Sequence, residues 1–128
     1  MLKPFADASG FVDIDKHTMQ SKLHSNVFAL GDCCNAPTSK TAAAVSSQSR
    51  VVFENLRSLM AGRVLASKYD GYTSCPLITS FQSVVLAEFD YDLKPKETFF
   101  FDQGKESRLM YFMKRDVIPR IYWNMLLT

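Results

Sequence analysis

The fold of this chain is decided by one stretch, Asn26-Val27-Phe28-Ala29-Leu30-Gly31-Asp32. Val27 to Leu30 is a short apolar run with the length of a buried strand, and Gly31-Asp32 closes it. Turn-forming residues follow at positions 35–39. From Lys40 the chain becomes Ala-rich, which predicts a helix that runs to about Met60 and stops at Gly62. The predicted unit is therefore a strand, a Gly-Asp pair, a loop and the N-terminus of a helix.

The Gly-Asp pair and the helix start suit a flat ligand that carries a hydroxylated chain. Gly31 lets a backbone approach such a ligand closely, and Asp32 offers a carboxylate to the hydroxyl donors of a ribityl or ribose chain. The helix behind them directs free N–H groups and a partial positive charge toward its own start. The alternative is an ordinary strand–turn–helix crossover in which Asp32 only caps the loop.

The composition is that of an ordinary globular domain. Of the 128 residues, 47% are hydrophobic and 22% are charged, which suits one modest domain with its own core. The net charge of +2, with acids and bases interleaved, gives no case for nucleic-acid binding. The three cysteines form neither a disulfide framework nor a zinc pattern. No apolar run reaches the roughly 18 residues of a membrane span, and the chain as given shows no targeting segment.

Short strands are predicted before the Gly-Asp pair. Phe11–Asp15 alternates apolar and polar residues, and Ser21–Leu23 follows a turn, so both are expected to be strands. His17 and His24 have no acid or cysteine at ligand spacing and are expected to be surface histidines. The helix that follows is expected to bury an apolar face made of Ala44, Val45, Val51, Val52, Leu56 and Leu59.

The second half predicts a cysteine-bearing loop, a strand and a helix. Cys75 stands beside a proline in a predicted loop, where its thiol would be accessible, although an unreactive buried cysteine is the commoner case. Phe99–Phe101 is expected to be a strand, and Gln103–Val117 an amphipathic helix that Pro119 breaks. The Met and aromatic stripe of this helix suits a buried core, but its basic fringe also suits a helix lying on a membrane. Cys33-Cys34 is expected to be a buried pair.

Two groups of residues resemble known flavoproteins. The strand that ends in Gly31-Asp32, followed by Lys40-Thr41-Ala42-Ala43-Ala44, resembles the second FAD signature of two-dinucleotide-binding flavoproteins. A close resemblance to animal mitochondrial sulfide:quinone oxidoreductases, which belong to that class, is carried by Tyr69-Asp70-Gly71-Tyr72-Thr73-Ser74-Cys75-Pro76-Leu77 and Val85-Leu86-Ala87-Glu88-Phe89-Asp90-Tyr91. Together with the Gly-Asp region, the resemblance covers nearly the whole chain.

The resemblance implies an α/β fold, the C-terminal portion of an FAD/NAD(P)-binding, Rossmann-like flavoprotein with a small β-meander and a C-terminal helix. Residues 1–64 would be a segment of the FAD-binding domain. Residues 65–128 would form a β and helix region with a tail that contacts the mitochondrial inner membrane. The implied reaction oxidises hydrogen sulfide, passes two electrons through FAD to ubiquinone, and transfers sulfane sulfur to a small thiol acceptor or sulfite. No metal is implied.

The resemblance also assigns roles to residues. Cys75 matches one of the family's two redox-active cysteines and would be the sulfur on the flavin side. Gly31-Asp32 matches the FAD-binding pair, and Lys40-Thr41 lies in the segment that approaches the flavin. Positive charge at this helix start would favour the anionic reduced flavin. Lys114 matches a lysine near the quinone end of the site.

Two parts of the family pattern are not in this sequence, the Gly-x-Gly-x-x-Gly turn and the partner cysteine. Both belong to the first half of the family's length, so the chain is expected to be incomplete, inactive alone and poorly soluble. Residues 79–83 also depart from the family's sequence. A non-catalytic fragment or interaction module therefore stays open as an alternative, as does a flavin NADH:quinone-type reductase. The Thr-Ser-Cys-Pro-Leu setting of Cys75 argues against the latter.

Overall fold

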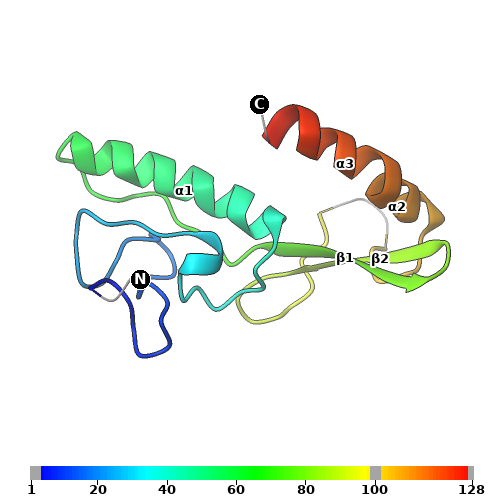
Figure 1. The fold of residues 1–128 in the computed structure, drawn as a ribbon, viewed down its shortest axis with the longest axis horizontal. Coiled ribbons are helices and arrows are strands. Elements are labelled where there is room, and N and C mark those ends of the chain that lie inside the picture. The colour runs from blue at the N-terminus through cyan, green and yellow to red at the C-terminus, as the bar shows by residue number, and fades with distance from the viewer. Residues whose placement is uncertain (1–3, 99–101, 127–128) are drawn as a thin grey trace. The chain divides into compact units, whose positions relative to one another are not determined.

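The protein forms two compact units in a computed structural model that describes residues 4–98 and 102–126 (Figure 1). Unit 1 comprises Met1–Thr73 and Phe89–Lys94, and unit 2 comprises Ser74–Glu88 and Pro95–Thr128. Within the described residues it is a small α/β protein, with a two-stranded antiparallel sheet and helices.

The first part of unit 1 is extended chain joined by single β-bridges. Bridges pair Ala6 with Val12, Val12 with Cys34, Ile14 with Ser21, and Gln20 with Phe28. The predictions of strands at Phe11–Asp15, Ser21–Leu23 and Val27–Leu30 were therefore wrong. Tight turns interrupt the chain too often for a ladder to extend beyond one pair. In one of them, the Asp15 carboxylate accepts hydrogen bonds from the backbone of the turn that follows it.

Helix α1 (Ala42–Met60) follows, as predicted, and its ends have local causes. Thr41 caps the start, where its hydroxyl oxygen accepts a hydrogen bond from the Ala44 N–H at 3.2 Å. At the other end, the Gly62 N–H donates to the Leu59 carbonyl at 3.0 Å, and the Arg63 N–H to the Ser58 carbonyl at 2.8 Å. The stop signal at Gly62 is confirmed.

The face that α1 buries differs from the predicted apolar one. Its buried residues are Ala44, Gln48, Val51 and Asn55. Leu56, which was expected inside, is 40% exposed. Ala44 and Val51 are buried as predicted, whereas the buried amides of Gln48 and Asn55 were not expected. Val51 joins the hydrophobic core cluster of unit 1, whose other buried members are Val12, Ile14, Met19, Ala29, Cys34, Ala36 and Tyr69.

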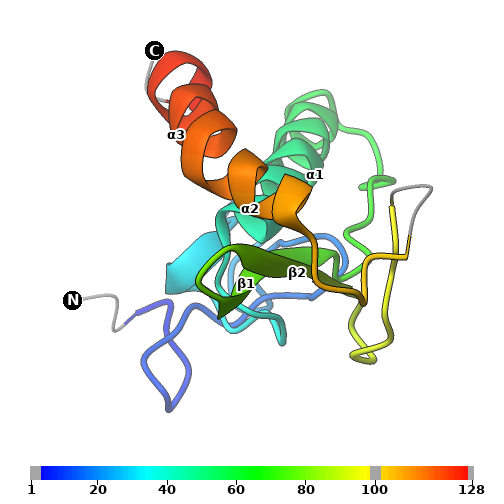
Figure 2. The ribbon, with the colours of Figure 1, turned by 90° about the vertical axis from the view of Figure 1, so that its right-hand side faces the viewer.

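Unit 2 contains a β-hairpin and a long helical stretch (Figure 2). Strand β1 (Thr73–Ser80) and strand β2 (Ser83–Phe89) pair across a short turn. The first residue of β1 and the last residue of β2 belong to unit 1. Among the described residues this sheet has two strands. The further strand predicted at Phe99–Phe101 lies outside the described residues.

The C-terminal helical stretch passes through Pro119 without a break. Helix α2 (Arg108–Phe112), a π-helical segment (Met113–Val117), helix α3 (Ile118–Ile121) and a second π-helical segment (Tyr122–Leu126) follow one another directly. The prediction that the helix starts at Gln103 and is broken by Pro119 was wrong. Proline sits in the first turn of α3, where its missing N–H is tolerated, and the wider π turn before it makes room for the ring.

Candidate functional site

The Gly-Asp pair forms a single 3-10 turn (Gly31–Cys33) held against α1. Gly31 has φ +67°, a left-handed conformation that suits glycine, and its N–H donates to Gln48 Oε1 at 2.8 Å. A Cβ at this position would lie 3.1 Å from Val45 Cγ2. The glycine therefore permits a close approach of this turn to α1. Asp32, in contrast, is exposed, and no side chain in the described part of the chain binds its carboxylate.

Lys40 braces the loop between this turn and α1. Its ammonium donates to the carbonyl of Cys34 at 2.8 Å and to that of Ala36 at 3.1 Å, and it lies 5.9 Å from the centre of the Phe11 ring. The residue itself is exposed. Lys40 thus fixes the path of the loop, a role that the sequence did not suggest, while one ammonium proton remains for another acceptor.

The Thr41 hydroxyl makes two contacts, and both stabilise the start of α1. Besides capping α1, its hydroxyl lies 3.0 Å from the hydroxyl of Thr73, which is buried. Gly31, Lys40 and Thr41 therefore shape the loop, and Asp32 is the member of the set whose polar atoms face solvent.

Cys75 lies in strand β1, so the prediction of a loop was wrong. Its thiol is exposed, in agreement with the prediction that it would be accessible. The half-buried Lys114 reaches across unit 2, and its ammonium donates a short hydrogen bond to the carbonyl of Pro76. Cys75 and Lys114 were assigned to opposite ends of the site, yet the structure brings the lysine to the residue next to the cysteine. The two lie far apart in sequence, and no local pattern signals this contact.

The chain is similar in sequence to one group of known proteins. No family model matches the chain. The chain is 55% identical over 97% of its length to the mouse (Mus musculus) "Sulfide:quinone oxidoreductase, mitochondrial". It is 48% identical over 93% of its length to the protein of that name from Schizosaccharomyces pombe, and 50% identical over 94% to that from Dictyostelium discoideum. Its relatives are mitochondrial sulfide:quinone oxidoreductases.

The sulfide:quinone oxidoreductases are much longer than this chain. It spans 28% of the mouse protein and 27% of each of the other two, an extent consistent with a C-terminal fragment of such an oxidoreductase. A solved structure is also similar, a chain in the cryo-EM structure of the Tetrahymena thermophila mitochondrial ATP synthase. The TM-score is 0.86 and the identity 25%, over 94% of this chain and 30% of that chain.

The adjacent cysteines Cys33 and Cys34 have different surroundings. Cys34 is fully buried, and its thiol donates to the Gly31 carbonyl at 3.3 Å. Cys33 is exposed, and its thiol donates to the Leu30 carbonyl at 3.2 Å. The prediction of a buried pair is confirmed for Cys34 and was wrong for Cys33.

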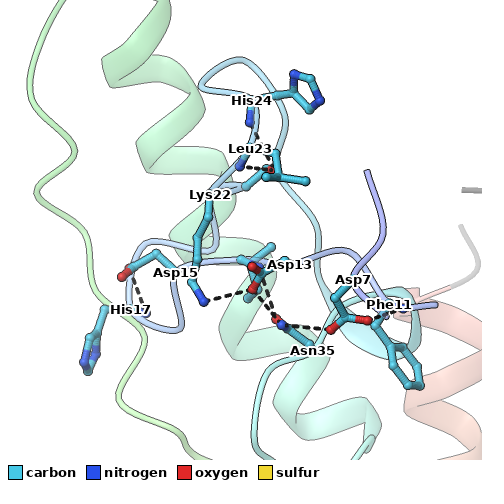
Figure 3. Close-up of polar contacts among 11 residues, drawn as sticks. Asp7, Phe11, Asp13, Asp15, His17, Lys22, Leu23, His24 and Asn35 are labelled. Carbon is cyan, nitrogen blue, oxygen red and sulfur yellow. Dashed lines mark hydrogen bonds and ion pairs between the residues drawn. The ribbon is translucent and has the colours of Figure 1, made fainter. Parts of the chain in front are cut away.

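A polar network that sequence reasoning missed ties the start of unit 1 together (Figure 3). Asn35 Nδ2 donates to Asp13 at 2.8 Å and to Asp7 at 3.2 Å, and Lys22 donates to Asp13 at 2.9 Å. The Lys22 hydrogen bond lowers the pKa of the Asp13 carboxyl, with a further contribution from Asn35. In the sequence, Asn35 was recognised only as one of the turn-forming residues. The network links three segments of unit 1 that lie apart in the sequence, around Asp7, Asp13 and Asn35.

Both histidines lie on the surface, as predicted, and Figure 3 shows their rings directed away from the network. The His17 ring lies 3.2 Å from the Tyr69 carbonyl, and the His24 ring 3.4 Å from the Pro4 carbonyl. Within residues 4–98 and 102–126, no three His, Cys, Asp or Glu side chains gather as metal ligands would. In the same part of the chain, no helix has the length and apolar character to cross a membrane.

Proposed function

We propose that this chain supplies the flavin-facing and thiol-bearing part of a mitochondrial sulfide:quinone oxidoreductase. The observation that carries the proposal is the 55% identity to the mouse enzyme over 97% of the chain. On this view, residues 1–64 complete a Rossmann-like FAD-binding domain, and residues 65–128 carry the thiol and a tail that contacts the inner membrane. The chain alone would be catalytically incomplete.

The residues of the Gly-Asp turn fit FAD in part. The exposed Asp32 carboxylate can accept hydrogen bonds from the ribityl or ribose hydroxyls. The Gly31 N–H is already bonded to Gln48, and two protons of the Lys40 ammonium are bonded to carbonyls. Gly31, Lys40 and Thr41 would therefore act by fixing the loop and the helix start. FAD, when bound, would accept two electrons from sulfur and deliver them to ubiquinone.

Cys75 would carry out thiol–disulfide exchange with a second cysteine supplied by the portion of the relatives' length that this chain does not span. Hydrosulfide attacks that cysteine in the disulfide, the S–S bond breaks, and Cys75 leaves as a thiolate with the electron pair. The persulfide sulfur then passes to the thiolate of a small acceptor, which frees the second cysteine. Loss of two electrons from the two thiolates reforms the disulfide. In the net reaction, sulfide and the acceptor thiol are converted to the persulfide of the acceptor, and two electrons are released.

Lys114 would support this chemistry by positioning. Its hydrogen bond to the Pro76 carbonyl ties the helical stretch to β1 beside Cys75. The exposed apolar side chains of the same stretch, such as Phe112 and Trp123, lie among basic residues, which supports contact with an anionic inner-membrane surface and access to ubiquinone.

The test uses a chimera, defined here as the mouse enzyme in which this chain replaces the matching segment. Cys75→Ser should lower sulfide-dependent quinone reduction at least about a hundredfold, because the exchange loses its leaving thiolate. Arg63→Ala, which alters an exposed residue after α1, should leave the rate within about twofold. Equal activity of the Cys75→Ser chimera and its parent would exclude the proposed role. If a flavin NADH:quinone reaction were the native one, Cys75→Ser would spare it.

A second candidate function is an interaction module in a mitochondrial assembly. The observation that favours it is the TM-score of 0.86 to a chain in the Tetrahymena mitochondrial ATP synthase structure. This candidate predicts that the chimera binds no flavin and reduces no quinone. A flavin absorbance spectrum of the purified chimera separates the two candidates, since only the first requires bound FAD.

A further inference from the structure

The outer side of α1 carries a second regular row of residues. They follow one another at alternating steps of four and three, and we name them the outer seam: Ala42, Ser46, Ser49, Phe53, Leu56 and Met60. All are exposed, and Phe53 is 57% exposed and Met60 81%. The row lies about 150° around the helix axis from the buried face. A repeat of about 3.5 residues is the spacing of a helix packed lengthwise against another helix.

The outer seam is more apolar at its large positions than the face that α1 buries. The buried face uses the amides of Gln48 and Asn55, whereas the seam presents Phe53, Leu56 and Met60 to solvent. An exposed stripe of large apolar side chains on a helix is typical of a face that another element covers. Small residues at the N-terminal half of the seam would let a neighbouring backbone come close there, and bulky ones would fill the gap farther along.

The borders of the seam indicate the charge of its partner. One border carries Arg50 and Arg57, both exposed. The Arg57 guanidinium lies 5.5 Å from the centre of the Phe53 ring, so it already stands over the seam. The single acid nearby, Glu54, is 3.8 Å from Arg57, too far for a strong pair, and both are about half exposed. A partner with acidic residues beside its apolar stripe would complement this border.

We propose that the outer seam docks a helix, with acidic residues beside its apolar stripe, from the portion of the sulfide:quinone oxidoreductases' length that this chain does not span. That portion is nearly three quarters of the mouse relative, of which the chain covers 28%. A second copy fits less well. In an antiparallel pair centred near position 51, the Arg50 residues of the two copies would meet in the middle of the interface. The proposal rests on the family match and requires none of the sulfide chemistry.

The direct test is the protection of a thiol placed in the seam. Ser49→Cys should react with a maleimide at least about tenfold more slowly in the chimera than in the chain alone, as read from the labelled α1 peptide. Glu54→Cys, exposed on the same helix outside the seam, should react within about twofold in both. Equal labelling of Ser49→Cys in both proteins would overturn the proposal. Protection in the chain alone, with the mass of a dimer, would also overturn it by assigning the seam to a second copy.

A second measurement guards against a local effect of the added thiol. Phe53→Ser should lower the melting midpoint of the chimera while leaving the helical circular dichroism of the chain alone unchanged. Leu23→Ser removes another exposed apolar side chain of unit 1, 58% exposed, and should leave both unchanged. A Phe53→Ser chimera that melts like its parent contradicts the docking. So does a chimera that never melts cooperatively, because the seam would then not engage the mouse portion.

Discussion

Replacing Asn55 by Ala tests whether amides, and not apolar contacts, hold α1 in unit 1. Asn55 is fully buried. Its Nδ2 donates to the Thr18 carbonyl at 3.0 Å and the Ser67 carbonyl at 2.9 Å, and its Oδ1 accepts from the Ser67 N–H at 3.1 Å. Each such bond contributes about 1 kcal/mol net, and its loss leaves a backbone group unpaired. Asn55→Ala should therefore lower the free energy of opening of α1 against Thr18 and residues 63–69 together by about 3 kcal/mol.

Hydrogen exchange of the chimera measures this loss where it occurs. A change of about 3 kcal/mol corresponds to exchange that is about a hundredfold faster in the peptide covering residues 63–69. Asn55→Asp keeps the shape, but the ionised carboxylate cannot donate to either carbonyl and the protonated form can donate to one at most, so this variant should also be destabilising. Glu54→Ala, on the exposed side of the same helix, should change exchange less than about twofold. The reasoning is refuted if Asn55→Ala exchanges like Glu54→Ala.

Three further substitutions test single contacts in the chimera by thermal or pH-dependent melting. Gly31→Ala should cost about 1–2 kcal/mol, because its φ of +67° is left-handed and the new Cβ crowds α1. Gly10→Ala, at φ +87° with open space, isolates the conformational part of that cost. Lys22 lowers the pKa of Asp13 from 3.8, so this stabilisation is present above the unfolded pKa and is lost as pH falls through the folded one. Asp13→Asn should therefore weaken the fall of the melting midpoint with decreasing pH below about pH 4. A pH dependence identical to that of the parent would contradict the assignment. Thr41→Ala should cost about 1 kcal/mol through loss of the helix cap, and Thr41→Ser should restore it.

The C-terminal end of α1 was predicted from the sequence because its cause, the glycine at Gly62, acts within one turn of the helix. The cap at Thr41 is just as local, but it was missed, because the helix was expected to begin at Lys40. Pro119 shows the limit of the same logic. Its effect depends on whether the preceding turn widens into a π-helix, which no single residue encodes.

The buried face of α1 could not be predicted by counting apolar residues. Gln48 and Asn55 are buried because backbone groups distant in sequence, at Gly31, Thr18 and Ser67, need partners. Those needs arise only when the loops of unit 1 come together. The apolar period of the helix was detected, but part of it belongs to the outer side.

The same contrast between local patterns and contacts distant in sequence applies to the residues of the candidate site. Asp32 and Cys75 were predicted as site residues because their neighbours in sequence form recognisable patterns. The structure shows that both are exposed, and their roles stay predictions. The bracing of the loop by Lys40 and the bond from Lys114 to the Pro76 carbonyl were missed. A lysine that serves a backbone carbonyl has no sequence signature, because every residue offers that carbonyl.

The two faces of α1 also determine how stable the chain should be by itself. Inside, the helix is held by amide hydrogen bonds, which replace bonds to water and so add little net free energy each. Outside, Phe53, Leu56 and Met60 stay partly in water, although full burial of such a side chain contributes about 1.5–3 kcal/mol. A docked helix would supply that contribution and raise the melting midpoint. Circular dichroism should therefore show a broad melt for the chain alone and a cooperative one for the chimera. A sharp transition in the chain alone would mean that its inner contacts suffice, and the thermodynamic need for a docked helix would disappear.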